Sequence, residues 1–136
     1  MKEDIDIPVV EDISVAIVKE WNEEKTAEVF NVYLLNQKAE QINDVLVSSR
    51  GYGQNKTTGE KVVTSTLRHY IGTVEKKDFA KIEPIMEEVF GLNNEYWVSF
   101  YVDGKIHDKK FIFLPETVIE ENMVTVPILD KEGVII

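Results

Sequence analysis

The fold is decided by one stretch of the chain, which reads Asn-Asn-Glu-Tyr-Trp-Val-Ser-Phe-Tyr-Val at 93–102, Asp-Gly-Lys at 103–105 and Ile-His-Asp-Lys-Lys-Phe-Ile-Phe-Leu-Pro at 106–115. Aromatic and β-branched residues dominate the two long runs, and such residues suit the pleated, half-buried surface of a sheet. The Asp-Gly pair supplies the positive φ angles that a tight hairpin turn requires. The stretch therefore predicts a β-hairpin, and we expect the rest of the chain to pack on it.

Outward from this hairpin, turn residues divide the chain into further short apolar segments. Residues 13–20 alternate like a strand with one buried face, and a helix stays open as the alternative because apolar residues also recur there at helical spacing. In the segment 62–71 the odd-numbered side chains from Val63 to Ile71 would form the buried face. Other strands are expected at 29–35, 45–50 and 79–82, with a last edge strand at 124–129 that Pro127 interrupts.

Two segments between strands carry signals of their own. Residues 51–59 are dense in Gly, Asn and Thr, which predicts a loop joining two strands. Pro84 and Gly91 enclose a short apolar segment in the order expected of a brief helical turn, with Pro at its start and Gly after its end. The side chains of that turn expected to face inward are Ile85, Met86, Val89 and Phe90.

Many short strands and almost no sustained helical period predict an all-β fold. We interpret the chain as an antiparallel, immunoglobulin-like β-sandwich with one short helical turn, although the Cys-Trp-Cys signature of antibody domains is absent. The expected organisation is an N-terminal arm at 1–12, one sandwich domain at 13–130 and a C-terminal tail at 131–136. A single domain suits 136 residues, since a chain of this length buries roughly two-thirds of its unfolded surface.

Charge and composition exclude several classes of function. The formal net charge is -10, and a net acid without a basic stripe is poorly suited to nucleic acid, whose phosphates attract Lys and Arg. The chain has no cysteine, so a disulfide framework, a thiolate metal site and a Cys nucleophile are all absent. The acidic start and the lack of a long apolar run predict a cytoplasmic protein that does not enter a membrane.

Catalytic and metal-binding patterns are sparse. His69 shares its side of a strand with Leu67 and Ile71, which favours a core imidazole hydrogen-bonded to a neighbour over a catalytic one. His107 and Asp108 are adjacent on a strand and so point to opposite faces, which prevents a His-Asp relay. No serine lies in a Gly-x-Ser-x-Gly elbow, and no calcium or zinc motif is present. We expect no metal and no cofactor.

The strand at 96–102 has large side chains on both of its faces. Tyr96, Val98, Phe100 and Val102 share one face, and Trp97, Ser99 and Tyr101 share the other. One face must contribute to the core. The other is either covered, with the apolar end at 134–136 as the expected cover, or exposed as a patch for a partner.

Two segments carry a resemblance to a known family. Ser65-Thr-Leu-Arg-His69 and Leu92-Asn-Asn-Glu-Tyr-Trp-Val-Ser-Phe100 resemble those of a small family of uncharacterised bacterial proteins, some of which are labelled phenylalanyl-tRNA synthetase β-chain. The resemblance spans most of the chain and implies a small cytosolic domain. It assigns no residue to a synthetase motif.

Three hypotheses of function follow, and the first leans away from an enzyme. The protein acts through contacts with a protein partner or with itself, at a sheet edge or at the face of Trp97, Ser99 and Tyr101. Alternatively, it is an accessory factor of translation that contacts tRNA or a synthetase. A third hypothesis is a small hydrolase or ligand-binding domain that uses His69, with Arg68 as a further contact. The basic residues available to the tRNA hypothesis are Arg50, Lys56, Lys61 and Arg68.

Overall fold

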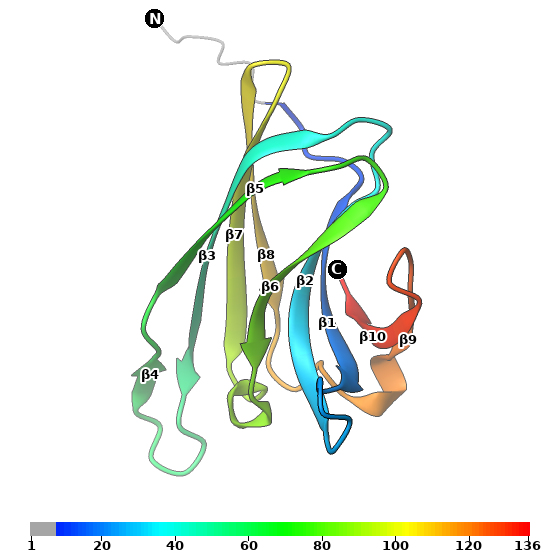
Figure 1. Ribbon diagram of the computed structural model, residues 1–136. Helices are drawn as coiled ribbons and strands as arrows, with labels where there is room; N and C mark the ends of the chain where they lie inside the picture. Colours follow the sequence, from blue (N-terminus) through cyan, green and yellow to red (C-terminus); the bar gives the residue numbers. More distant parts are fainter. Residues whose placement is uncertain (1–7) are drawn as a thin grey trace, which may run out of the picture.

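The computed structural model describes residues 8–136 and shows two antiparallel sheets packed as a sandwich (Figure 1). Sheet A has the strand order β6-β2-β1-β10-β9, and sheet B has the order β4-β3-β7-β8, with β5 also paired to β3. The strands of sheet A are β1 (Ile13–Trp21), β2 (Glu28–Asn36), β6 (Asp78–Ile85), β9 (Val124–Val126) and β10 (Lys131–Ile135). Those of sheet B are β3 (Ile42–Gln54), β4 (Lys61–Val63), β5 (Leu67–Val74), β7 (Asn93–Val102) and β8 (Lys105–Phe113).

The expected hairpin is confirmed as β7 and β8. Tyr96 lies opposite Phe111 and Val102 lies opposite Lys105, so the strands pair along their whole length. Asp103 and Gly104 have φ angles of 51° and 73°, as a two-residue hairpin turn with positive φ at both positions requires. The inner face of β7 is almost completely buried, and it forms a large part of what sheet B contributes to the core.

The core lies between the sheets and follows the two-residue period of the strands. Sheet A contributes Val15, Ile17, Val32 and Leu34, and sheet B contributes Val45, Val47, Tyr96, Val98, Phe100, Phe111 and Phe113. All of these side chains are at most 3% exposed. Residues 13–21 are therefore a strand, and the helical alternative for this segment is wrong.

The segment at 62–71 departs from the expected single strand. It is split into β4 and β5, both of which pair with β3, and residues 64–66 between them are outside either strand. Val63 and Leu67, expected on a buried face, are 64% and 51% exposed. The break has a local cause, because the Thr64 hydroxyl accepts a hydrogen bond from the backbone N–H of Gly51 at 2.7 Å and so replaces a regular ladder contact. The loop expected at 51–59 also starts later, since β3 continues to Gln54.

The turn around Pro84 is shorter than expected. β6 continues through Pro84 to Ile85, which is tolerated because β6 is an edge strand of sheet A. Only residues 87–89 form a turn of 3₁₀ helix, and a second such turn spans 120–122. Ile85 and Phe90 face inward as expected, but Met86 is 65% exposed.

The C-terminal segment 131–136 differs most from the expectation of a tail, because residues 131–135 form β10 between β1 and β9. Gly133 permits this position. A Cβ atom added there would lie 2.5 Å from the carbonyl oxygen of Ile17, so no other residue fits without moving the strands apart. Figure 1 shows this end of the chain beside β1, as a strand of sheet A.

Of the arm expected at 1–12, residues 1–7 lie outside the described residues. Val10 packs against the main core. In the part of the chain from residue 8 onwards, no helix is long and apolar enough to cross a membrane.

Candidate functional site

The outer face of sheet B carries a group of exposed apolar side chains, which we call the aromatic face. Strand register brings these side chains together: Tyr101 lies opposite Ile106 across the β7–β8 pair, and Leu46 of β3 lies opposite Tyr70 of β5. The members of the aromatic face are Leu46, Tyr70, Trp97, Tyr101 and Ile106, with exposed fractions between 40% and 69%. Four neighbouring strands therefore contribute to one apolar surface.

Trp97 is held in a fixed position at the centre of this face. Its indole N–H donates a hydrogen bond to the Asp108 carboxylate. The Lys110 ammonium lies 4.7 Å from the centre of the Trp97 ring, within the range of a cation–π contact. With both contacts made, Trp97 still keeps 45% of its surface exposed.

Beside Trp97 lies a hollow of about 260 Å³, lined by Leu46, Ser48, Arg68, Trp97, Ser99, Ile106 and Asp108. The hollow joins apolar walls with one cation, one carboxylate and two hydroxyl groups. Trp, Tyr and Arg are the residues that most often dominate binding energy at protein interfaces. The arrangement is suited to anchoring an apolar side chain whose neighbour is polar or charged.

The expected cover at 134–136 does not lie on this face. Val134 and Ile135 pair with Ile17 and Ala16, so they belong to sheet A and not to the outer face of sheet B. Among the described residues, none buries Trp97 or Tyr101 completely. Of the two alternatives that the sequence leaves for this face, cover or exposure, the structure shows exposure.

Two of the four basic residues that the tRNA hypothesis would use make ion pairs with carboxylates. Arg50 lies 3.3 Å from the buried Glu95 carboxylate, and Lys56 pairs with Glu116. Within residues 8–136, neither Lys61 nor Arg68 makes an ion pair. Two of the four basic residues are thus paired with carboxylates.

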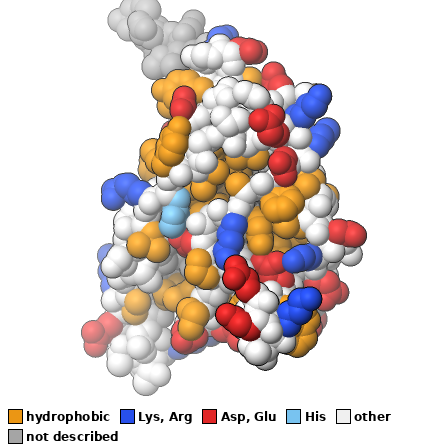
Figure 2. All heavy atoms as spheres, in the orientation of Figure 1, with side chains coloured by type: hydrophobic (Ala, Val, Ile, Leu, Met, Phe, Trp, Pro, Cys, Tyr) orange, Lys and Arg blue, Asp and Glu red, His pale blue; other side chains and the backbone are white. Residues whose placement is uncertain are grey.

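A second site, the inter-sheet pocket, lies where the free edges of the two sheets face each other. On the side of the molecule seen in Figure 2, hydrophobic side chains gather between the sheets. The cavity is about 260 Å³ and reaches the inner face of β7. Its lining comes from β3, β5, β6, β7 and the turn at 87–89, with Leu67, Ile85, Met86, Val89 and Tyr96 as its main apolar contributors.

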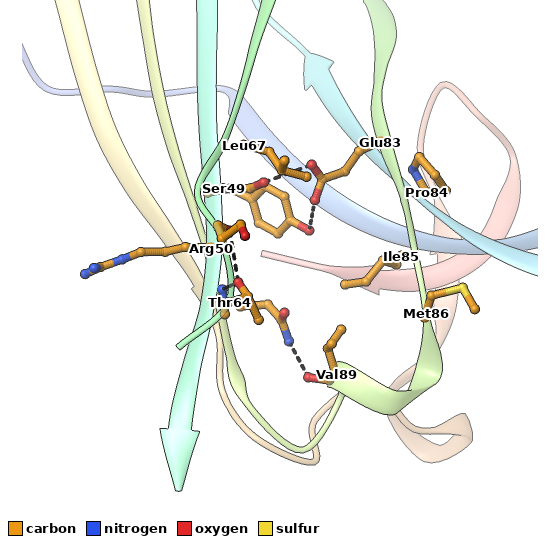
Figure 3. A pocket seen from close by; sticks show the side chains of 13 residues that line it. Ser49, Arg50, Thr64, Leu67, Glu83, Pro84, Ile85, Met86 and Val89 are labelled. Atoms are coloured by element: carbon orange, nitrogen blue, oxygen red, sulfur yellow. Dashed lines mark hydrogen bonds between the residues drawn. The ribbon is translucent and has the colours of Figure 1, made fainter. Parts of the chain in front are cut away.

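The Glu83 carboxylate is the polar centre of this pocket (Figure 3). Its Oε1 accepts a hydrogen bond from the Ser49 hydroxyl at 2.8 Å and lies 2.7 Å from His69 Nε2. Its Oε2 accepts one from the Tyr96 hydroxyl at 3.1 Å. Burial, and then the Glu83 carboxylate, raise the pKa of Tyr96 far above its ordinary value, so the phenol remains a donor.

A β-bulge explains why Glu83 points inward. Lys81 lies opposite Tyr33 but Glu83 lies opposite Val32, so Ile82 is an extra residue in β6. Without the bulge, strict alternation would place Glu83 on the outer face with Lys81. The bulge places Ile82, Glu83 and Ile85 all toward the core.

The histidines occupy different surroundings. His69 points between the sheets and contacts Glu83, as expected of an imidazole bonded to a neighbour, and its side chain is 29% exposed. Arg68, the adjacent residue, points to the outer face beside Ser48, so the two do not meet. Ser49 and His69 both contact one oxygen of Glu83, whereas a nucleophilic triad places the imidazole between the hydroxyl and the acid.

His107 lies on the inner side of β8, where its ring stacks on Phe100 at 5.1 Å between ring centres. Asp108 is on the outer face and accepts from Trp97. His107 and Asp108 therefore point to opposite faces of β8, as the alternation of a strand requires. In the part of the chain from residue 8 on, no three His, Cys, Asp or Glu residues are grouped so as to hold a metal ion.

Sequence reasoning named Trp97, Ser99, Tyr101 and His69 as candidates, but it did not name Glu83 or the other members of the aromatic face. Alternation along one strand is a local signal, and it places Trp97 and Tyr101 correctly on a common face. Leu46, Tyr70 and Ile106 join them only through strand register, which no single segment reveals.

Comparison of the chain with family models, with curated proteins and with solved structures found no match.

Proposed function

We propose that the protein is a non-enzymatic binding domain that recognises a protein partner through the aromatic face. The observation that carries this proposal is the exposure of Trp97 and Tyr101, 45% and 40%, in a chain whose other sheet buries a cluster of five apolar residues on its outer face. Contiguous apolar surface on a soluble domain usually marks a binding site. The ordered contacts of Trp97 also reduce the entropy lost on binding.

The charges on the face define the chemistry of the partner. Asp108 accepts from Trp97 and Asp44 accepts from the Tyr70 hydroxyl at 3.0 Å, so both carboxylates are engaged. Arg68 projects into the hollow beside Trp97 without an ion pair among the described residues. The partner is therefore a protein segment with an apolar side chain for the hollow and a carboxylate for Arg68. A second copy of this chain, with net charge -10, would meet general electrostatic repulsion.

A quantitative pull-down with matched variants tests the proposal. The double variant Trp97→Ala with Tyr101→Ala removes the anchors, and Trp21→Ala is the control because Trp21 is also an exposed tryptophan, in β1 of sheet A, with 59% of its surface exposed. We expect specific partners to be lost with the double variant and kept with the control, with unchanged circular dichroism for both. Arg68→Glu should weaken the same interaction.

Two results would contradict the proposal. Partners retained at wild-type levels by the double variant would exclude the aromatic face. A dimer in sedimentation that dissociates with the double variant would replace the external partner by a second copy.

Two further proposals have fewer observations behind them: the immunoglobulin-like topology, and the contact with tRNA that the family resemblance implies. Two stacked antiparallel sheets and the chain length support an immunoglobulin-like arrangement, which a strand-by-strand superposition on such a domain would test. The tRNA hypothesis has less support, because Arg50 and Lys56 are engaged in ion pairs. A gel shift at low salt that shows no retardation at micromolar protein would dispose of it.

A further inference from the structure

We propose that the inter-sheet pocket is a binding site for a small organic amine, with the ammonium group on Glu83 and an apolar body against Leu67, Ile85 and Val89. This site is separate from the aromatic face, so the inference does not rest on the proposed function. Four observations lead to it: the charge of Glu83, its free acceptor site, the shape of the cavity and the apolar lining.

The first observation is a carboxylate that pairs with no Lys or Arg among the described residues. The Glu83 side chain is 12% exposed, and its three partners are two hydroxyl groups and an imidazole, none of which carries the permanent charge of Lys or Arg. Arg50 also lines the cavity, but its side chain points away from it in Figure 3 and pairs with Glu95. A carboxylate surrounded by apolar groups is costly without a counter-charge, and a bound cation would supply one.

The second observation concerns the acceptor sites of this carboxylate. An ionised carboxylate has about four lone-pair positions, and three of them are used by Ser49, His69 and Tyr96. Oε1 has two of these partners and Oε2 has one. Oε2 can therefore accept one further hydrogen bond, which is what an incoming N–H would donate.

The third and fourth observations set the size and character of the ligand. A cavity of about 260 Å³ lies just below the roughly 300–1,000 Å³ typical of drug-sized ligands, so the site suits a smaller molecule. Ile85 and Val89 form its wall next to Glu83, and the exposed Met86 stands at its rim. An amine with a short apolar body would place its charge on Glu83 and its carbon skeleton against this wall. An anion would be repelled, and a neutral alcohol would leave the carboxylate uncompensated.

Three probes that share one carbon skeleton test the inference: 2-phenylethylamine, 2-phenylethanol and phenylacetate. At pH 7 the amine is protonated, because alkyl ammonium groups such as that of Lys titrate near 10. We expect saturable shifts of the amide resonances of Gly51 and Ile85 in titrations followed by nuclear magnetic resonance. The alcohol and the acid should bind at least about tenfold more weakly, which corresponds to about 1.4 kcal/mol.

Variants decide whether Glu83 is responsible. Glu83→Gln keeps the shape and removes the charge, so amine affinity should fall at least about tenfold, as expected for the loss of a charge-assisted hydrogen bond. Glu20→Gln is the matched control, since Glu20 is a comparably buried carboxylate with three donors on the far side of sheet A, and it should leave amine affinity unchanged. Equal affinity of the three probes, or unchanged affinity in Glu83→Gln, would overturn the inference.

A second variant covers the case in which Glu83→Gln fails to fold. Met86→Lys changes an exposed position at the rim and introduces a competing ammonium within reach of the cavity. Amine affinity should again fall by about tenfold, by competition rather than by loss of structure. Amine binding at wild-type affinity in Met86→Lys would also overturn the inference. These amine-binding results do not depend on the aromatic face, so they stay the same even if the pull-down shows that this face binds no partner.

Discussion

The outer faces of the two sheets both carry apolar side chains, and they differ in what covers them. On sheet A, Ala16, Val18, Tyr33 and Leu35 form a second cluster with Val126, and Leu129 and Ile135 pack against it. On sheet B, the aromatic face remains between 40% and 69% exposed. The same chain therefore covers one apolar face with its own C-terminal segment and leaves the other open.

The polar groups on the two faces differ in the same way. Glu20 on sheet A is 8% exposed and accepts hydrogen bonds from Asn31, Tyr33 and Lys131, at 2.6, 2.6 and 2.7 Å. On sheet B the carboxylates of Asp44 and Asp108 bond to aromatic residues at the surface. Polar contacts on sheet A add to folding stability, whereas those on sheet B orient exposed rings. This difference is why we propose that a partner binds to sheet B.

The largest effect should come from matched leucines on the two faces. Leu35 is completely buried and Leu46 is 43% exposed. Leu35→Ala should lower the free energy of unfolding by about 3 kcal/mol, because it leaves a cavity that the surrounding strands cannot close. Leu46→Ala should cost less than about 1 kcal/mol. Urea denaturation measures both, and equal losses would mean that the aromatic face is packed in solution.

The next effect concerns β10, the strand of sheet A that the C-terminal segment forms. Gly133→Ala places a methyl group against the backbone of Ile17, and neither β1 nor β10 can move without losing pairing. We expect a loss of about 2 kcal/mol from overpacking. Gly91→Ala is the control, since an added Cβ there meets nothing within 4 Å. Thermal unfolding would compare the two, and an unaffected Gly133→Ala would show that β10 is loosely attached.

A smaller difference is expected between two tyrosines. The Tyr33 hydroxyl donates to the largely buried Glu20 at 2.6 Å, and the Tyr70 hydroxyl donates to the exposed Asp44 at 3.0 Å. Tyr33→Phe should cost about 1.5 kcal/mol, as for a hydrogen bond to a charged group out of water. Tyr70→Phe should change stability by less than about 0.5 kcal/mol, because water replaces the lost donor. Similar losses in denaturation would place both carboxylates in equivalent surroundings.

Local signals predicted the hairpin and the alternation of β7 because neighbouring residues alone determine them. The Asp103-Gly104 turn and the aromatic strands are of this kind. The same reasoning placed Trp97 and Tyr101 on one face, but it could not tell whether the face was covered. Coverage depends on which strand the C-terminal segment joins, and that segment pairs with residues over 100 positions earlier, such as Ile17 with Val134.

Glu83 was beyond sequence reasoning for a different reason. An extra residue in β6 reverses the side to which every later side chain of the strand points. No residue near Ile82 predicts this β-bulge from the sequence. The partners of Glu83 also come from three other strands: Ser49 from β3, His69 from β5 and Tyr96 from β7. A site built from four strands becomes visible only when the sheets are assembled.

The smallest effect is a pH dependence that Glu20 of sheet A contributes. Burial by itself would raise the pKa of Glu20, but the hydrogen bonds from Lys131, Tyr33 and Asn31 outweigh it and hold that pKa below its ordinary value of 4.5. Because the folded state lowers this pKa, Glu20 contributes stability that is present above pH 4.5 and is lost as the pH falls through the folded-state value. The difference in unfolding free energy between the wild type and Glu20→Gln should therefore shrink from pH 7 to more acidic conditions. Tyr33→Phe, which removes one of the donors, should show a weaker dependence than the wild type. A difference between wild type and Glu20→Gln that stays constant with pH would mean that the carboxylate gains nothing from its partners, and the contrast between the two outer faces would then rest on apolar burial alone.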